Sequence, residues 1–230
     1  MIIAIVGGIG SGKSLFSVKR AIESPYHCFV NFDLKAPNTT RLKKENIILT
    51  EETTGPRGAV KKSFRVNWQF WNDAIRKHGN FHIILDEVHN IFHSRKAMSG
   101  WNVQATEWIS QIRKLLGDSE KTHLYLITQK VHRLDVAFRD LLHKIIACKS
   151  IKMPYLVKME VMERDKSIVK KKVPIVRLFQ FHFTGDYALE NYLAWSMSNK
   201  KAYSYRTSFI GNAYFDKYNT FEVFGESAYL

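Results

Sequence analysis

The feature that most constrains this chain is a glycine-rich motif that follows its first apolar run. Residues 2–6 form a short apolar stretch of the kind that becomes a buried parallel strand. This stretch leads into a motif with the spacing G-x-x-x-x-G-K-S, namely Gly7-Gly8-Ile9-Gly10-Ser11-Gly12-Lys13-Ser14. Residues 13–23 then have the pattern of a helix, which stops before Pro25. A glycine loop placed between a strand and a helix predicts a phosphate-binding loop rather than a chance glycine-rich turn.

Each part of this motif has a chemical role in binding a nucleoside triphosphate. Glycines let the backbone curl so that successive N–H groups point at phosphate oxygens, and the helix that opens at Lys13 adds the positive end of its dipole. The Lys13 ammonium neutralises charge on the β- and γ-phosphates, and the Ser14 hydroxyl is a ligand for Mg²⁺. We therefore predict ATP and Mg²⁺ as cofactors, bound by a loop that comprises Gly7, Gly8, Ile9, Gly10, Ser11, Gly12, Lys13, Ser14 and Leu15.

Two carboxylates follow a second apolar run and complete the predicted site. Residues 81–85 read as a buried strand that ends in Asp86 and Glu87. A carboxylate at the strand tip holds Mg²⁺ through water, so the predicted metal ligands are Ser14 and Asp86. Glu87 is placed to polarise the attacking water as a general base. The alternative is a solvated Asp-Glu pair in a turn, but a phosphate-binding loop requires such an acidic strand tip nearby.

The next predicted strand, at residues 122–128, ends in Gln129. In a P-loop sheet the neighbouring strand tip lies beside the γ-phosphate, so Gln129, with Thr128 second, is the candidate that senses this phosphate or positions the water. The alternative is an ordinary polar residue at a strand end. Four arginines that follow the carboxylate strand are candidates to reach the nucleotide of a neighbouring subunit, namely Arg95, Arg113, Arg133 and Arg139. The alternative for each is an ordinary surface charge.

Strands and helices alternate up to about residue 150, as they do in a doubly wound sheet. We predict further strands at residues 27–31 and 144–148, and helices at residues 71–78, 101–116 and 134–142. Residues 33–62 are polar, basic and turn-rich and are expected to form a surface excursion before a short strand at residues 64–68. Residues 89–100 are expected to form a loop or an irregular helix.

The sequence changes character beyond residue 150. We predict strands at residues 155–162 and 173–183, joined by a charged turn, and then a helix at residues 186–196, whereas the last thirty or so residues have no clear period. The predicted fold class is α/β: a P-loop NTPase with a mostly parallel doubly wound sheet and a small β-rich C-terminal extension. Residues 1–150 are expected to form the ATPase core, and residues 151–230 a basic β-hairpin and extension packed on it.

The charge balance points to a polyanionic partner. The chain of 230 residues has 35 Lys and Arg against 21 Asp and Glu, a net charge of +14. Such a charge attracts nucleic acid, although a basic surface can also serve solubility alone. Residues 130–177 contain thirteen Lys and Arg against five Asp and Glu, a net +8. A basic hairpin there would contact DNA phosphates without reading bases, and the alternative is a solvated charged turn at Lys170-Lys171-Lys172. A second, weaker basic patch comprises Lys35, Arg41, Lys43 and Lys44.

Several other features have simpler interpretations. Cys28 and Cys148 are far apart in apolar runs, so we expect two buried thiols rather than a disulfide, and a reducing compartment such as the cytoplasm. Residues 1–6 are too short for the apolar part of a signal peptide, and no run of about 18 apolar residues predicts a membrane span. His89 and His93 are four apart, which permits metal binding, but packing or a polar surface is favoured. The Trp68, Phe70 and Trp71 cluster favours core packing over base stacking.

With these residues in hand, the chain resembles the Zot-like branch of the FtsK–HerA ATPases. This branch includes the zonular-occludens-toxin-like morphogenesis proteins of filamentous phages, and related ATPases package genomes into membrane-containing icosahedral viruses. The matching segments are residues 2–14, 85–95 and 127–129, a following helix with Leu134, Asp135 and Arg139, and residues 213–220 near the end. The first two motifs are general to P-loop ATPases, whereas the Asp-Glu-x-His segment followed by Thr-Gln is more specific.

The resemblance implies a role for each matching residue and an oligomeric assembly. It implies that Lys13 and Ser14 bind the phosphates and Mg²⁺, and that Asp86 binds Mg²⁺. Glu87 would be the catalytic base and Gln129 the sensor. It also implies that Arg139 is the arginine finger in trans, and that the protein forms a homo-oligomeric ring, often a hexamer, with nucleotide at the subunit interfaces.

One departure from the family bears on function. The filamentous-phage proteins carry a membrane span after the ATPase domain, and this sequence has none. We therefore expect an ATP-driven DNA translocase that packages a viral genome into a preformed shell, with viral capsid or portal-vertex proteins as partners, in the host cytoplasm or at the virion vertex. One alternative is a Zot-like ATPase that drives filamentous phage assembly or extrusion through protein contacts. A second is a small-molecule kinase, which the +14 charge and the adjacent Asp86 and Glu87 disfavour.

Overall fold

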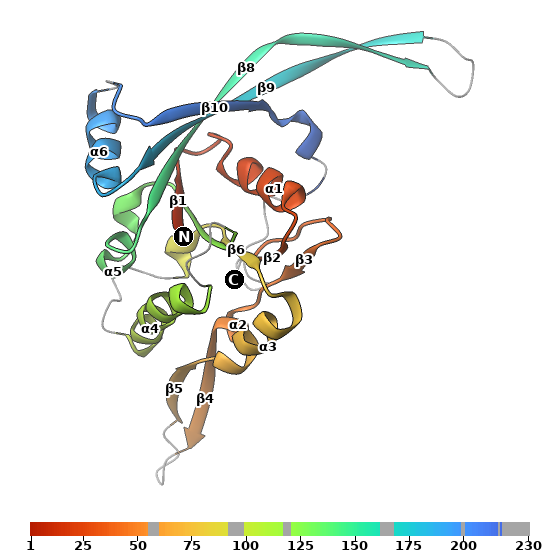
Figure 1. The fold of residues 1–230 in the computed structure, drawn as a ribbon. Helices are drawn as coiled ribbons and strands as arrows, with labels where there is room; N and C mark the ends of the chain where they lie inside the picture. The colour runs from red at the N-terminus through yellow and green to blue at the C-terminus, as the bar shows by residue number, and fades with distance from the viewer. Residues whose placement is uncertain are drawn as a thin grey trace.

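Six parallel strands form the centre of the main sheet in a computed structural model of the chain (Figure 1). The full strand order is β10-β9-β8-β1-β7-β6-β2-β3. The core strands include β1 (Ile2–Val6), β2 (His27–Val30), β3 (Thr39–Arg41), β6 (Phe81–Leu85) and β7 (His123–Thr128). The structure describes residues 1–54, 60–91, 99–116, 121–161, 168–198, 201–215 and 217. The predicted fold class, an α/β protein with a mostly parallel sheet and an antiparallel extension, is confirmed.

Every residue of β1 and of β6 is buried, because helices cover both faces of the sheet. Successive side chains of a strand point to opposite faces. Ile3 and Ile5 of β1 pack with Phe16 and Val18 of α1 (Lys13–Glu23) on one face. The other face is covered by α3 (Trp68–His78), α4 (Gly100–Leu115), α5 (Val136–Arg139) and α6 (Ala188–Ser198). Helix α1 therefore covers the face that the phosphate loop leads into, and Phe209 and Tyr214 pack beside it.

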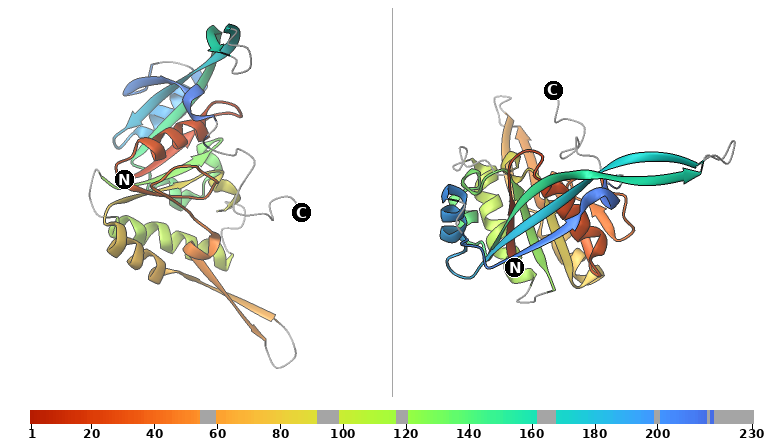
Figure 2. Two further views of the ribbon diagram at one scale, coloured as in Figure 1. Left: turned by 90° about the vertical axis from the view of Figure 1, so that its right-hand side faces the viewer. Right: turned by 90° about the horizontal axis from the view of Figure 1, so that it is seen from above.

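Strand β8 (Lys144–Val161) joins the parallel core to an antiparallel extension. Its first residues pair with β1, and its whole length pairs with β9 (Ile168–Thr184), which in turn pairs with β10 (Tyr205–Ile210). The β8–β9 hairpin projects well beyond the rest of the molecule, as both views in Figure 2 show. Strand β8 passes through residue 150 without a break, and the division of the chain there stays a prediction.

The sequence predicted two strands where β8 is one. Pro154 breaks the apolar pattern, and proline cannot donate to a strand ladder. The structure accommodates it with a shift of register between Met153 and Leu156 on β8. A local irregularity thus absorbs the proline while the strand continues.

Residues 33–62 form more structure than the predicted surface excursion. Strand β3 extends the edge of the main sheet beside β2. The short helix α2 (Lys44–Ile47) and a separate hairpin of β4 (Ile48–Thr54) and β5 (Val60–Val66) follow. Leu42, Ile47 and Ile48 are almost completely buried. Because these few apolar residues are surrounded by charged ones, the polar composition of the segment concealed its contribution to the core.

Other boundaries differ because of local capping. The helix predicted at residues 134–142 is a 3₁₀ turn at Val131–Arg133 followed by the short α5, since the Asp135 side chain accepts a hydrogen bond from Ala137 N and starts the helix there. Asn67 accepts from Phe70 N and starts α3 directly after β5, so the strand predicted at residues 64–68 ends early. The last part of the chain, predicted to lack a period, contains β10 and a 3₁₀ turn at Gly211–Tyr214.

Two further expectations from the sequence are met in the described residues. Cys28 and Cys148 are free and buried. Trp71 is completely buried against Phe81 and Trp108, as core packing requires. Within the described ranges, no helix has both the length and the apolar character that crossing a bilayer demands.

Candidate nucleotide-binding site

The phosphate loop connects the carboxyl end of β1 to the first turn of α1. Gly12 precedes the helix with a φ of 87°, a left-handed conformation that favours glycine. A Cβ atom at this position would lie 1.9 Å from Leu178 Cδ2 of β9. The loop therefore needs glycine at residue 12 for two reasons, its backbone conformation and its contact with the C-terminal extension.

Lys13 is buried and reaches back across the loop. Its exposed fraction is 7%, and its Nζ donates a hydrogen bond to the carbonyl oxygen of Gly8 at 3.0 Å. The first turn of α1 contains no acidic residue, so nothing in it offsets the positive end of the helix dipole. An ammonium group and the start of a helix thus converge on one place, as an anion-binding loop requires.

Ser14 and Asp86 meet although they are 72 residues apart in the sequence. The Ser14 hydroxyl donates to Asp86 Oδ2 at 2.6 Å. Burial raises the pKa of the Asp86 carboxyl, and the hydrogen bonds from Ser14 and from the Glu87 N–H oppose that shift only in part. Such a carboxylate favours a nearby cation, and carboxylate and hydroxyl oxygens are the donors that Mg²⁺ prefers. The residues present therefore fit a Mg²⁺ ion; their role as its ligands stays a prediction.

Asn31 holds the backbone of Asp86 in place. It follows β2, is 1% exposed, donates from Nδ2 to the Asp86 carbonyl oxygen at 2.9 Å and accepts from Asp86 N at 2.6 Å. Sequence reasoning missed this residue. Its signal was available: Asn31 is a polar residue at the carboxyl end of a buried parallel strand, in the position that Asp86 has on β6.

Glu87 has a strained backbone and a histidine partner. Among the described residues it is the one non-glycine with a positive φ, at 46°, and a position of this kind often marks a functional site. Its Oε2 lies 3.3 Å from Nδ1 of His89. His89 Nε2 lies 3.4 Å from Nη1 of Arg133, which can only donate, so Nε2 accepts and Nδ1 carries the hydrogen that faces Glu87. The Thr128 hydroxyl also lies 3.4 Å from Nδ1.

This arrangement assigns His89 a contact that the sequence did not reveal. Packing or a polar surface was favoured for His89 and His93, and the structure places His89 against the predicted base; His93 is outside the described residues. Among the side chains that the structure describes, no group of three or more His, Cys, Asp or Glu residues is placed to hold a metal ion.

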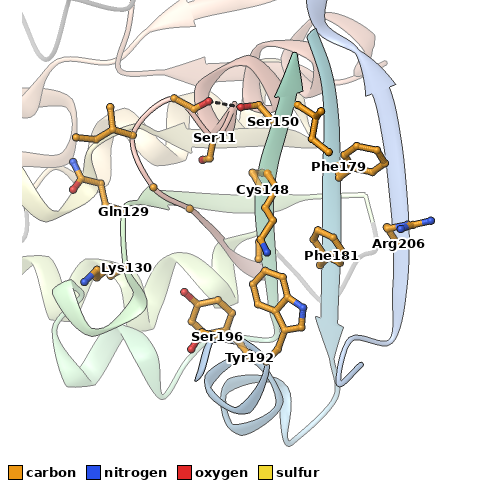
Figure 3. Close-up of a pocket in the computed structure, with 18 residues that line it drawn as sticks. Ser11, Gln129, Lys130, Cys148, Ser150, Phe179, Phe181, Tyr192, Ser196 and Arg206 are labelled. Carbon is orange, nitrogen blue, oxygen red and sulfur yellow. Dashed lines mark hydrogen bonds between the residues drawn. The ribbon is translucent and has the colours of Figure 1, made fainter. Parts of the chain in front are cut away.

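Gln129 lies at the tip of β7 beside the phosphate loop. Its carbonyl oxygen accepts from Gly7 N at 3.4 Å, and its side-chain Oε1 accepts from Arg133 Nη1 at 2.9 Å. Gln129 does not line the cleft of about 390 Å³ that Lys13, Ser14 and Glu87 share. It faces a neighbouring pocket instead (Figure 3). Its predicted role as sensor stays a prediction.

The arginine candidates fall in different places. Arg133 is bound within its own chain to Gln129 and His89. Arg139 ends α5, and the chain then reaches His143, whose N–H donates to Ile2 O at the end of β1 that is remote from the phosphate loop. The Arg139 Nε is buried with no hydrogen-bond partner. Arg95 and the side chain of Arg113 lie outside the part of the chain that the structure describes.

The C-terminal extension closes over the phosphate loop and α1. The Ser150 hydroxyl of β8 donates to the Gly10 carbonyl oxygen at 2.6 Å. Leu178, 1% exposed, packs against Gly12, and the Tyr214 hydroxyl donates to Glu23 of α1 at 2.6 Å. Lys152, Val176, Leu178 and Phe215 complete the wall of the 390 Å³ cleft. No motif in the sequence marks these residues, because their place depends on how the hairpin folds back.

The strand order and the glycine loop between β1 and α1, with Ser14 beside Asp86, define an α/β fold of the P-loop NTPase class. No family model and no curated protein matches the chain. Similar solved structures include the N-terminal domain of zonular occludens toxin from Neisseria meningitidis, with 18% identity over 95% of this chain and 98% of that one and a TM-score of 0.48.

A second similar structure is the genome packaging NTPase from Sulfolobus turreted icosahedral virus 2 in complex with ATP-gammaS. It has 15% identity over 64% of this chain and 74% of that one, and a TM-score of 0.39. A third is the DNA-packaging ATPase from Sulfolobus Turreted Icosahedral Virus, with 18% identity, the same coverage and a TM-score of 0.38. These are the two kinds of protein that the sequence resemblance names. The fold class and the roles of residues rest on this chain's own topology and geometry.

Proposed function

We propose that this protein is an ATPase that translocates DNA, acting as a homo-oligomeric ring in viral genome packaging. The observation that supports this most directly is the cleft in which Lys13, Ser14 and Glu87 meet, with Asp86 Oδ2 2.6 Å from the Ser14 hydroxyl. These groups come from two separate strand ends and assemble the parts that phosphoryl transfer to water needs.

The chain's own residues divide the chemistry among them. Backbone N–H groups of residues 8–14 and the start of α1 bind the phosphates, and Lys13 exchanges its bond to Gly8 O for a phosphate oxygen. Ser14 and Asp86 are the residues that would hold Mg²⁺, which supplies positive charge to the β- and γ-phosphates when bound. Glu87 accepts the proton of the attacking water.

His89 positions Glu87 for this task. Its Nδ1–H faces the carboxylate, and its other nitrogen is fixed by Arg133, which also holds Gln129. A change at Gln129 therefore reaches Glu87 through Arg133 and His89. We propose that Gln129 reports the state of the γ-phosphate through this chain of contacts.

Arg139 is our candidate for the finger that reaches a neighbouring subunit. In its own chain it lies toward the edge of the sheet away from the phosphate loop, and its Nε lacks a hydrogen-bond partner. The family resemblance supports this role for Arg139 and a ring of subunits, for which we propose six.

DNA is the proposed polyanion. The net charge of +14 and the projecting β8–β9 hairpin, whose sequence is rich in lysine, support contact with the phosphate backbone (Figure 2). We propose that residues 1–150 hydrolyse ATP and that residues 151–230 carry this basic arm. Capsid or portal-vertex proteins would be the further partners, in the host cytoplasm or at the virion vertex.

An ATPase assay with and without DNA tests the proposal, together with the size of the assembly with ATP. Lys13→Ala and Glu87→Gln should both abolish hydrolysis, and Glu87→Gln should still bind ATP because it leaves the phosphate contacts intact. Lys77→Ala, a lysine on the remote helix α3, is the matched control and should hydrolyse ATP normally. Normal turnover by Glu87→Gln would refute the assignment of the base. Hydrolysis that ignores DNA but responds to coat protein would favour phage assembly instead.

A further inference from the structure

A second pocket, of about 650 Å³, borders the phosphate loop but is distinct from the nucleotide cleft. Its walls are loop residues 7–11, the facing surfaces of β8, β9 and β10, and α6 (Figure 3). We call it the aromatic pocket because four rings line it: Phe179, Phe181, Tyr192 and Trp195. Nothing in the proposed hydrolysis mechanism uses these rings.

The aromatic pocket is also cationic. Lys130, Lys149 and Arg206 line it, and its described lining contains no Asp or Glu. Positive side chains that gather without acidic neighbours favour an anionic occupant. The chain as a whole carries a net charge of +14, so the pocket is part of a surface that attracts polyanions.

The cations already lie on the ring faces. Lys149 Nζ lies 4.6 Å from the centre of the Trp195 ring and 5.9 Å from that of Phe181. Arg206 Cζ lies 5.6 Å from the centre of the Phe179 ring. A flat base that replaced these cations on the ring faces would gain stacking and would release the cations to bind its phosphate. The occupant that fits is therefore both flat and anionic, which describes a nucleotide.

The position of the pocket favours a nucleotide within a single strand. Lys149 and Ile151 of β8 line it, and β8 continues from these residues into the projecting basic hairpin. A strand that runs along the hairpin would therefore pass the pocket. The bases of a duplex are stacked and paired inside the helix, so a duplex cannot place a base against Phe179 or Phe181.

We propose that the aromatic pocket binds a nucleotide of single-stranded DNA, with its base against Phe179 and Phe181 and its phosphate on Lys149 and Arg206. This inference rests on the proposed function, because it requires that the chain binds DNA. It adds the strand type, the residues that hold the strand, and a place where the strand meets the ATPase machinery.

The pocket shares a wall with the nucleotide cleft. Ile9, Gly10 and Ser150 line both, and the Ser150 hydroxyl is bonded to the Gly10 carbonyl oxygen. A base that enters the aromatic pocket therefore contacts the same loop whose N–H groups face the phosphates of ATP. Single-stranded DNA should for this reason change the rate of hydrolysis more than duplex DNA does.

The test measures binding of a fluorescein-labelled 20-nucleotide oligo-dT and of a labelled 20-bp duplex by fluorescence anisotropy. Phe179→Leu keeps an apolar side chain but removes the ring, and should weaken single-strand binding by about tenfold while duplex binding stays within about twofold. Phe181→Leu should act likewise and serves as a second variant if the first is poorly folded. Arg206→Ala should also weaken single-strand binding and lower its salt dependence by about 0.7 in the logarithmic slope.

Arg76→Ala is the matched control for Arg206→Ala, since Arg76 lies on α3, is 80% exposed and does not line the pocket. All four variants should bind mant-ATP as the unaltered protein does, because the nucleotide cleft is separate. Equal single-strand affinity in the unaltered protein and Phe179→Leu would overturn the inference while leaving DNA translocation in place. A second equivalent of ATP per chain that Phe179→Leu abolishes would assign the pocket to free nucleotide and overturn it too. Absence of binding to either DNA would refute the proposed function itself.

Discussion

Replacement of Gly12 by alanine tests the contact between the C-terminal extension and the phosphate loop. Gly12 has a φ of 87°, and an added Cβ would lie 1.9 Å from Leu178 Cδ2. Gly10, in the same loop, provides the matched control: its φ is 71°, but an added Cβ there has no atom within 4 Å. The two substitutions therefore share the conformational cost and differ in the steric one.

The magnitudes follow from these two terms. A left-handed backbone costs a residue with a Cβ about 1–2 kcal/mol, which is the expected loss for Gly10→Ala. Overpacking a filled site adds about 1–3 kcal/mol, so Gly12→Ala should lose about 2–5 kcal/mol of unfolding free energy. For a chain of this length, each kcal/mol lowers the melting temperature by about 2–4 °C. Gly12→Ala should thus melt about 4–20 °C below the unaltered protein.

A double-mutant cycle attributes the difference to Leu178. In a Leu178→Ala background, which removes the clashing atoms, Gly12→Ala should cost no more than Gly10→Ala does. The assay is thermal unfolding followed by circular dichroism, with urea unfolding as a second measure of the free energy. If Gly12→Ala melts within about 2 °C of Gly10→Ala, Leu178 does not pack on the loop and the placement of the extension is refuted.

Three further predictions concern the site and its pH dependence. Asn31→Ala leaves the Asp86 N–H and C=O without their hydrogen-bond partner. It should therefore lower the unfolding free energy by about 1–3 kcal/mol and slow ATP hydrolysis. An unchanged melting temperature and kcat would contradict the assigned role. His89→Ala should lower kcat for ATP hydrolysis by about tenfold and leave KM within about twofold. The reason is that the substitution removes the contact that positions Glu87 but removes no contact to phosphate. A change in KM alone would point to a binding role. Burial lowers the pKa of His82 to about 4 and of His182 to about 3, so both stay neutral in the folded chain while the unfolded chain takes up protons below about 6.5. The unfolding free energy should therefore be constant above pH 6.5 with respect to these two groups and should decline as the pH falls from 6.5 toward 4. A melting temperature that stays flat between pH 7.5 and 4.5 would show that the two rings are not buried as described.

The C-terminal extension contacts the nucleotide-binding part of the chain at several points. Ser150, Leu178 and Tyr214 each contact the phosphate loop or α1, although Ser150 is the last residue of the predicted ATPase core and the other two follow it. Burial, and then the hydrogen bond to Glu23, raise the pKa of Tyr214 to about 12, so the contact persists across the physiological range.

The sequence by itself determined the parts of this protein whose signals are local. Strand β1, the glycine loop and α1 have the bounds that the apolar run, the motif and Pro25 predict. Strand β6 likewise ends at Leu85, before Asp86. A parallel sheet places the ends of its strands at one edge, so two such motifs also predict that their side chains meet, as Ser14 and Asp86 do.

Tertiary structure alone decided which other groups surround that pair. Asn31, His89 and Leu178 touch the site through contacts that depend on strand order, on a strained turn at Glu87 and on a hairpin that folds back. Asn31 and Leu178 reach the site from distant parts of the chain, whereas His89 reaches Glu87 through the left-handed turn at Glu87. The end of a strand marks Asn31 as a candidate, but the packing of the whole sheet decides which groups these residues contact. The single strand proposed for the aromatic pocket has the same origin, since its rings and cations come from β8, β9, β10 and α6 and meet only in the folded protein.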